Sequence, residues 1–515
     1  DWLIMQEEES RQRFVQLLNQ HTLVSANTLL EMLKSVDPAI QASACGLLWK
    51  HWDVDNSLRA AQTFHTLMQG NEEQKEAAIQ LLARTSESRF AQYVQTLLDD
   101  PSPSIRRSAN VALAQLANTQ HRKLVGDVIQ LLNDKDHEVR MTVFSAIERI
   151  GDSGGIPLML ESGEQFSPYQ RRLAHQAILR IGLKSVPMCM SVFKDERYPY
   201  TGRSIAARAL SLMAFPQLEA AVPHLIQREI HRAYQMIVIY QTVREQSFSS
   251  AALECLTHFY KDEQIRSLGF ILELLSLGGR MANHEMIIAS LSSPNPSTRS
   301  NAIETLEQSV NRSFYKLLLP LVDGRSPEQQ VAFYQKQFPA KPVTMETIID
   351  NAWKSLNPLE KSIAAQAKLE IHGASQNEAQ LRSILESLCV DMETAHPRVK
   401  EVILSLLRKL DDPATETSID RLAFFKRTSF FANVLIGELV PLVQQAESFD
   451  YMAGACLYRK GDPADALFIP RIGELERVRE TNVKVEPLEV LGLESLLTNA
   501  TRQEEVLASS DGSAY

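Results

Sequence analysis

The sequence predicts a mostly α-helical protein, a superhelical solenoid followed by a small C-terminal β-region. Three observations predict this fold class. A turn-and-helix pattern recurs along the chain, the residue after each turn returns with a period in the low thirties, and strand-like stretches appear only after residue 411. A period of this size that persists over several units is typical of stacked helical pairs. Each pair is too small to bury its apolar face alone, so its neighbours must stack on it.

The stretch from Leu97 to Ala117 shows the pattern most clearly. An apolar helix end meets a turn rich in Asp, Pro and Ser, and the apolar residues of the next helix recur every three or four positions. That spacing keeps one face of a helix turned inward. The same design returns at residues 131–151 and 396–410. The expected inner-face residues are Ile105, Ala109, Ala112 and Leu116, then Val139, Val143, Ala146 and Ile150, then Val399, Ile403, Leu406 and Leu410.

The length of the repeat follows from the spacing between the residues that come directly after each turn. Six such positions are separated by 34, 31, 34, 31 and 32 residues, and a later pair is separated by 33. This pattern resembles that of HEAT and armadillo-like repeats, and the resemblance implies a curved array of stacked helical pairs. The post-turn positions are Gln41, Lys75, Arg106, Arg140, Arg171 and Arg203, followed by Arg266 and Arg299.

The post-turn arginines have two interpretations, a phosphate-binding ladder or a structural ladder that joins neighbouring repeats. A cation near a helix N-terminus is unfavourable to the helix dipole, so it needs a nearby acid. Asp136, four residues before Arg140, is placed to supply one. HEAT families use an Asp–Arg arrangement to join repeats, and the resemblance therefore implies the structural role.

Several segments depart from the regular pattern. Residues 216–262 fit an extended helix, in which His231 and Tyr234 indicate either a ligand site or, more commonly, core packing. Residues 323–344 are rich in Gln, Pro and Lys and predict a long loop, a feature that often maps to the binding face of a repeat protein. The predicted organisation is a leader or capping helix at 1–23, a solenoid at 24–410 with irregular insertions at 216–262 and 323–344, a linker at 411–418, and a β-domain at 419–515.

Composition narrows the function classes. The formal net charge of -10 argues against a broad nucleic-acid-binding surface, which needs clustered Lys and Arg. The five cysteines are scattered without a metal-ligand spacing, as expected of core residues in a reducing compartment. We expect no transmembrane segment in this chain, because its apolar runs are far shorter than the roughly 18–20 residues that a spanning helix needs. The chain begins at Asp1 without an initiator Met, so we expect a cytoplasmic piece of a longer protein.

The β-region carries a more specific resemblance. Residues 454–478, GACLYRKGDPADALFIPRIGELERV, resemble the first half of a cyclic nucleotide-binding β-roll, with two short helices and a Phe-Phe pair before them in that family's order. The continuation VLGLESLLTNATRQEEVLA resembles its phosphate-binding cassette. The resemblance implies a β-roll that is incomplete at Tyr515. The cassette positions that match are Gly492, the short helix at Leu496 and Leu497, and the closing residues Arg502, Val506 and Ala508.

The ligand implied by this resemblance is cAMP or cGMP. In that family the cassette arginine pairs with the cyclic phosphate and a glutamate after the glycine holds the ribose hydroxyl. Here Arg502 keeps the first role, but Leu493 stands at the glutamate position and Glu494 comes one position late. Gln503 replaces a small hydroxyl residue, and two glutamates follow it, which adds negative charge beside a phosphate site. We therefore expect a degenerate cassette and assign no certain cofactor.

The sequence contains no HExxH, GxSxG, P-loop or GxGxxG motif in a suitable context, which favours a non-catalytic protein. Our hypothesis is a scaffold or regulatory protein whose solenoid binds a protein partner or an adjoining membrane domain and is coupled to the β-roll. The domain order resembles the soluble C-terminal region of bacterial ATP/ADP-translocase-like major facilitator proteins, which implies a place at the cytosolic face of the membrane. The alternatives are a HEAT-fold enzyme of the lyase or DNA-repair type, and a pure adaptor with an inert β-roll.

Overall fold

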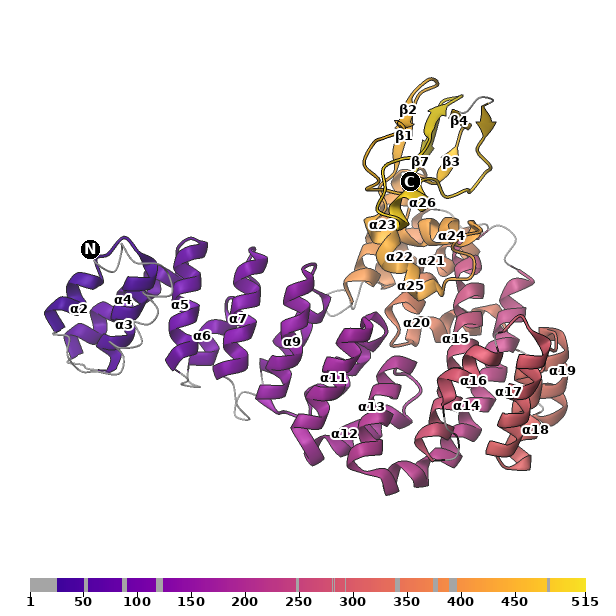
Figure 1. The fold of residues 1–515 in the computed structure, drawn as a ribbon, viewed down its shortest axis with the longest axis horizontal. Coiled ribbons are helices and arrows are strands. Elements are labelled where there is room, and N and C mark those ends of the chain that lie inside the picture. The colour runs from indigo at the N-terminus through magenta and orange to yellow at the C-terminus, as the bar shows by residue number, and fades with distance from the viewer. Residues whose placement is uncertain are drawn as a thin grey trace. The chain divides into compact units, whose positions relative to one another are not determined.

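The computed structural model describes residues 26–50, 54–85, 90–116, 124–246, 250–279, 281, 283–291, 293–338, 343–373, 378–388, 396–478 and 482–515. The leader helix expected at 1–23 lies outside these residues. The described chain is mostly helical, with small antiparallel sheets near its C-terminus (Figure 1). It divides into two compact units, Asp1–Ala220 and Ala221–Tyr515.

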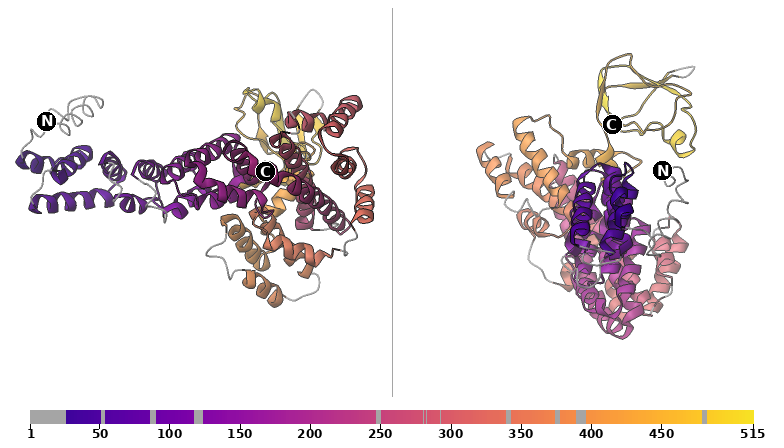
Figure 2. Two further views of the ribbon diagram at one scale, coloured as in Figure 1. Left: turned by 90° about the horizontal axis from the view of Figure 1, so that it is seen from below. Right: turned by 90° about the vertical axis from the view of Figure 1, so that its left-hand side faces the viewer.

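The first unit consists of helices that contact their near neighbours in the chain. Figure 2 shows these helices in two layers. Within one layer α3 contacts α5, α5 contacts α7, α7 contacts α9, α9 contacts α11, and α11 contacts α13. The helices are α2 (Ala26–Met32), α3 (Pro38–Lys50), α4 (Val54–Gln69), α5 (Glu72–Thr85), α6 (Ala91–Gln95), α7 (Pro103–Leu116), α8 (Val125–Gln130), η3 (Leu131–Asn133), α9 (His137–Ile150), α10 (Gly155–Glu161), η4 (Ser162–Gln165), α11 (Pro168–Ile181), η5 (Gly182–Ser185), α12 (Val186–Lys194) and α13 (Tyr200–Met213).

The expected inner faces of two helices are fully buried, since all four predicted positions of α7 and all four of α9 belong to the core. In the set predicted at 396–410, Val399, Ile403 and Leu406 are buried and Leu410 is half-buried. The turns begin and end their helices with ordinary capping chemistry: Asp136 accepts a hydrogen bond from the Val139 amide at the start of α9, and Gly151, with φ 64°, ends that helix. The spacing of apolar residues therefore predicted correctly which side of each helix faces inward.

The post-turn arginines close their own turns. Arg106, Arg140 and Arg299 each donate from Nη1 to the carbonyl oxygen six residues earlier, at 2.8, 2.6 and 2.6 Å. Arg171 donates from Nε to the carbonyl of Phe166 at 3.0 Å. Buried Arg203 donates from Nε to the carbonyl of Phe193 at 3.3 Å. Carbonyl groups that a tight turn leaves without a backbone partner thus receive a charged donor.

Two ion pairs connect successive turns. Lys75 Nζ lies 2.6 Å from Asp100 Oδ2, and Arg106 holds both carboxylate oxygens of Asp134 at 2.6 and 2.8 Å. The acid that serves the ladder is Asp134, whose partner is the arginine of the preceding turn. Asp136, which we expected to pair with Arg140, caps α9. Burial alone would raise the pKa of Asp134, but hydrogen bonds from Arg106 and the Asp136 amide outweigh it and hold that pKa below its ordinary value.

The second unit contains two long helices and a set of shorter ones. The extended helix expected in 216–262 is α14, and α15 follows it as a single helix through the position of Arg266. Its helices are α14 (Phe215–Arg244), which crosses the boundary, α15 (Ala251–Leu277), α16 (His284–Leu291), α17 (Pro296–Ser309), α18 (Arg312–Val322), α19 (Pro327–Gln337), α20 (Met345–Lys354), α21 (Pro358–Gly373), α22 (Glu378–Leu388), α23 (Pro397–Asp411), α24 (Ser418–Arg427), α25 (Ile436–Gln445) and α26 (Leu493–Leu497).

Two sequence expectations need correction here, those for Arg266 and for residues 323–344, whereas the core-packing interpretation of His231 and Tyr234 is confirmed. Arg266 does not follow a turn: it lies inside α15, 3.4 Å from Glu263 one helical turn earlier. The long loop expected at 323–344 contains α19, because Ser326 and Gln329 form a capping box that starts a helix. Buried Tyr234 stacks on Tyr334 with ring centroids 5.2 Å apart, and the Tyr334 hydroxyl lies 3.0 Å from His231 Nδ1, so these residues pack between helices.

The strands form two small antiparallel sheets, with orders β1-β7-β3 and β2-β6-β4-β5. The second sheet places Leu475 opposite Ala508 and Arg477 opposite Val506. A small core of its own lies between the sheets and includes Tyr458, Leu491 and Val506. The strands are β1 (Phe449–Tyr451), β2 (Cys456–Tyr458), β3 (Pro470–Ile472), β4 (Leu475–Val478), β5 (Val483–Lys484), β6 (Glu505–Ala508) and β7 (Gly512–Ala514).

Replacing Arg106 with Ala should lower the free energy of unfolding by about 1–3 kcal/mol, because the largely buried Asp134 loses its charged donor. The matched control is Arg180→Ala, which breaks the exposed pair with Glu148 and should cost less than about 1 kcal/mol. Urea unfolding measures both. Equal effects of the two substitutions would contradict the structural role of the inter-turn pair.

The same ion pair, Arg106 with Asp134, should make the free energy of unfolding depend on pH. A carboxyl whose folded pKa is lowered contributes stability above its unfolded pKa of about 4, and that stability is lost as the pH falls through the folded pKa. The difference in unfolding free energy between the natural chain and Asp134→Asn should therefore be larger at about pH 6 than at about pH 3. Exposed Glu138→Gln is the control. A difference for Asp134→Asn that stays constant across this range would rule out the contribution.

Candidate functional site

The cassette-like segment lies between β5 and β6 and contains the short helix α26. Gly492 precedes this helix with φ 81°, a left-handed conformation that favours glycine. Arg502 follows the helix and precedes β6. Its backbone is fixed from both sides, because its amide donates to the Asp462 carbonyl at 2.9 Å and its carbonyl accepts from the Gly461 amide at 2.8 Å. The turn at Gly461 and Asp462 therefore holds the cassette arginine in place.

The Arg502 side chain points into the C-terminal β-region and is 2% exposed. Nη2 donates to the carbonyl of Ala466 at 2.6 Å, and Nη1 lies 3.4 Å from the carbonyl oxygen of Gly492. The guanidinium carbon sits 4.6 Å from the ring centroid of Tyr458 and 5.5 Å from that of Phe468. Both aromatic contacts are within the range of cation–π attraction. The arginine expected to meet a phosphate is thus surrounded by carbonyl oxygens and aromatic faces.

The other predicted cassette residues are not brought together around a ligand space. Val506 and Ala508 are buried in the core between the sheets. Glu494 is exposed in the first turn of α26. Leu493 is half-buried beside it. Among the predicted residues, Arg502 lies against Gly492, and the Leu496 amide donates to the Gly492 carbonyl at 3.2 Å.

The charges next to Arg502 are acidic or already paired. Glu504 accepts from Arg477 Nε at 2.8 Å, and Arg477 also binds Glu489 at 2.6 Å. Asp465, 86% exposed, lies 3.9 Å from Arg502 Nη2. A cyclic phosphate needs donors. Both terminal nitrogens of Arg502 are already bonded to carbonyl oxygens, and its Nε is buried without a partner among the described residues. The residues present therefore do not fit cAMP or cGMP.

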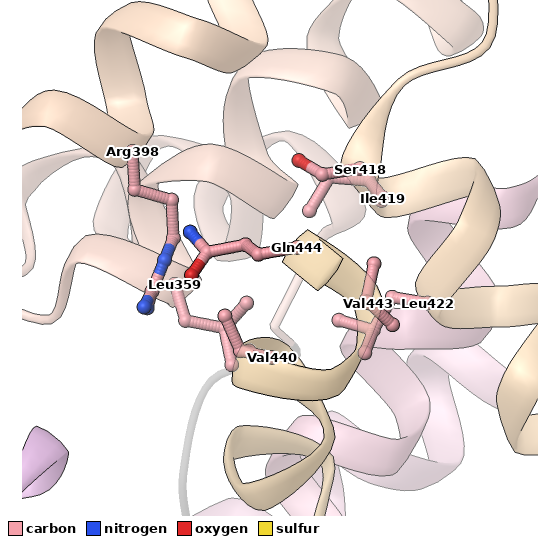
Figure 3. A pocket seen from close by; sticks show the side chains of 8 residues that line it. All are labelled: Leu359, Arg398, Ser418, Ile419, Leu422, Val440, Val443 and Gln444. Atoms are coloured by element: carbon pink, nitrogen blue, oxygen red, sulfur yellow. The ribbon is translucent and has the colours of Figure 1, made fainter. Parts of the chain in front are cut away.

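A small pocket lies elsewhere in the second unit, among α21, α23, α24 and α25 (Figure 3). Its enclosed space of about 10 Å³ has room for about one water molecule. Arg398 Nε and Ser418 Oγ are buried there without a hydrogen-bond partner among the described residues. Burial lowers the pKa of Arg398 to about 10. The accessible lining is apolar, from side chains such as Leu359 and Val440, so the pocket is not a built anion site.

The connecting segment before α24 forms a polar junction that sequence reasoning missed. Glu416 accepts from Arg421 Nε at 3.2 Å and from Arg471 Nη2 of β3 at 3.0 Å. Arg471 lies over the ring of Tyr515, 4.8 Å from its centroid. Buried Thr417 donates to Gln366 of α21 at 2.6 Å. The expected linker at 411–418 therefore ends in residues that are bonded both to helices and to strand β3.

Among the described residues, neither the cysteines nor groups of metal-ligand residues indicate a catalytic or metal-binding site. Cys45, Cys189 and Cys255 are free and buried, and burial raises the pKa of Cys45 to about 12 and that of Cys189 to about 11. Such thiols are unreactive at neutral pH. The described part of the chain holds no group of three or more His, Cys, Asp or Glu side chains that is suited to a metal ion. No helix in that part combines the length and apolar character required to cross a membrane.

Comparison with known proteins gives only distant similarity. No family model matches the chain, and no curated protein matches it. A cAMP-binding acyltransferase from Mycobacterium smegmatis is 25% identical over 18% of this chain and 32% of its own length, with a TM-score of 0.16. An engineered protein is 15% identical over 75% of this chain and 99% of its own, with a TM-score of 0.26. Scores this low carry no argument about the function of the chain.

Gly492→Ala should destabilise the C-terminal β-region more than Gly454→Ala. Both glycines have φ near 80°, so each substitution carries the cost of a left-handed conformation, about 1–2 kcal/mol. A Cβ on Gly492 would also lie 1.9 Å from Arg502 Nη1, whereas one on Gly454 meets nothing within 4 Å. We expect an additional loss of about 1–3 kcal/mol for Gly492→Ala, measured by thermal or urea unfolding. Equal losses would show that Arg502 is not held against Gly492.

Proposed function

We propose that this chain is a non-catalytic scaffold in which a HEAT-type helical array binds a protein partner and is coupled to a cyclic nucleotide-binding-like β-roll. Nearest-neighbour contacts between the helices of the first unit support the array. The arginines after its turns are used by turn carbonyls and neighbouring aspartates, which supports a structural ladder over a phosphate-binding one. Extended helical arrays offer long surfaces for other proteins, and this function needs no catalytic group.

The junction at Glu416 is the observation that carries the coupling. Ile469 and Tyr515 of the β-roll belong to the same buried core as α15, α21, α23, α24 and α25. Tyr515 contacts Phe424 and Phe425 of α24, with ring centroids 5.3 and 5.5 Å apart. A module that shares its core with the helices transmits strain to them, because packed interiors are stiff. The β-roll and the last helices therefore form one rigid body.

The interpretation as a pure adaptor is the second candidate, and the cassette favours it over a nucleotide sensor. Arg502 is already bonded within the chain, and Leu493 is an apolar residue at the position where the resemblance implies a ribose-binding glutamate. A lyase or DNA-repair enzyme has less support, because the polar clusters described above are ion pairs and caps.

The scaffold proposal is tested by purifying the full tagged chain from its source cells and cross-linking it to whatever co-purifies. We expect a stoichiometric partner whose cross-links fall on lysines of the helical residues 26–410. The tag alone is the control. The proposal fails if no protein is enriched over that control, or if all cross-links fall within residues 449–515.

Replacing Glu416 with Gln should loosen the β-roll from the last helices, because both Arg421 and Arg471 lose a charged acceptor. We expect faster amide exchange in β3 and β7 and a loss of about 1–3 kcal/mol in unfolding free energy. Exposed Glu447→Gln is the matched control. If exchange in β3 and β7 is the same in both variants, Glu416 does not couple the β-roll to the helices.

A further inference from the structure

Arg502 is a buried cation whose surroundings suit a cation. Its two terminal nitrogens face the carbonyl oxygens of Ala466 and Gly492. The nearest carboxylate is that of exposed Asp465, at 3.9 Å. Carbonyl oxygens and the negative faces of aromatic rings attract a positive charge and repel a phosphate. Arg502 is 2% exposed, so its N–H groups do not face solvent; Nη1 and Nη2 are bonded to these carbonyls, and Nε is buried without a hydrogen-bond partner among the described residues.

The shape of the cassette agrees with this chemistry. Only glycine fits at position 492, because a Cβ there would overlap the Arg502 guanidinium. Tyr458 of β2 and Phe468, whose backbone pairs with Leu491, both lie against the guanidinium, so two different parts of the roll contact it. The side chain therefore fills the space between α26 and the strands.

We propose that Arg502 is the permanent occupant of the cassette: its guanidinium takes the place that a cyclic nucleotide phosphate would take, and locks the β-roll in one closed state without ligand. The guanidinium group that fills the cassette belongs to the chain itself, as the side chain of Arg502. This inference goes beyond the scaffold proposal and does not depend on it.

One consequence is that a nucleotide cannot enter by simple addition. Entry of a phosphate would require Arg502 to leave two carbonyl acceptors and two aromatic contacts, and would place the anion against those carbonyls. Glu504, which directly precedes β6, and Glu505, the first residue of β6, add negative charge close to Arg502 in the sequence. The departures from the cassette pattern and the position of Arg502 thus point to the same closed state.

The test is chemical rescue in the full chain. Arg502→Ala should lower the midpoint of thermal unfolding by at least about 4 °C, because it empties a buried site. Millimolar methylguanidinium chloride should restore most of that loss, relative to sodium chloride at the same ionic strength. Exposed Arg459→Ala is the matched control and should show neither loss nor rescue. The natural chain should show no shift with cAMP or cGMP.

Two results would overturn the inference. One is a saturable shift of the natural chain with cAMP or cGMP that Arg502→Ala abolishes, because Arg502 would then serve a nucleotide. The other is an Arg502→Ala variant that methylguanidinium does not stabilise. If that variant fails to fold, Arg502→Lys decides, because a single ammonium cannot span both carbonyls. We expect Arg502→Lys to be less stable than the natural chain and unresponsive to cyclic nucleotides, and a nucleotide response would again overturn the inference.

Discussion

The first unit depends on one constraint: a short amphipathic helix pair cannot bury its apolar face without a neighbour. Six helices meet this constraint because each contacts the next one in the series α3, α5, α7, α9, α11 and α13. Their inner faces are lined by small and branched apolar residues that leave room for close approach, such as Ala109 and Ala112 of α7. The turns between them are then left with carbonyl groups and carboxylates that need donors.

Arginine side chains donate hydrogen bonds to such acceptors in both units. In the first unit Arg106 closes its own turn and reaches Asp134 of the next one, so one side chain joins two successive turns. In the second unit Arg502 likewise donates to a backbone carbonyl oxygen, that of Ala466 in the C-terminal β-region. Arg471 and Arg421 share Glu416 at the junction between roll and helices. The charged side chains that first suggested ligand binding are largely used to hold the fold.

Sequence reasoning succeeded where a local pattern has one physical outcome. The inner faces of α7 and α9 were predicted from the spacing of apolar residues, and the short helix in the cassette was predicted from the sequence resemblance. It failed where a pattern has two outcomes. Arg266 fits the period but lies inside a continuous helix, because nothing between residues 251 and 277 breaks α15. The segment at 323–344 is polar enough for a loop, but Ser326 and Gln329 cap a helix within it.

By itself the sequence determined that this chain is mostly helical, that a β-region follows the helices, and which cassette positions are present. These are local properties, because apolar spacing, turn residues and motif letters lie within a few tens of residues of one another. Only the tertiary structure decided where the arginine charges go. The partners of Arg106, Arg471 and Arg502 lie 28, 55 and 36 residues away at Asp134, Glu416 and Ala466. A long arginine side chain bonds the acceptors that lie near it in the folded protein. The spacing of residues along the chain does not specify which acceptors these are.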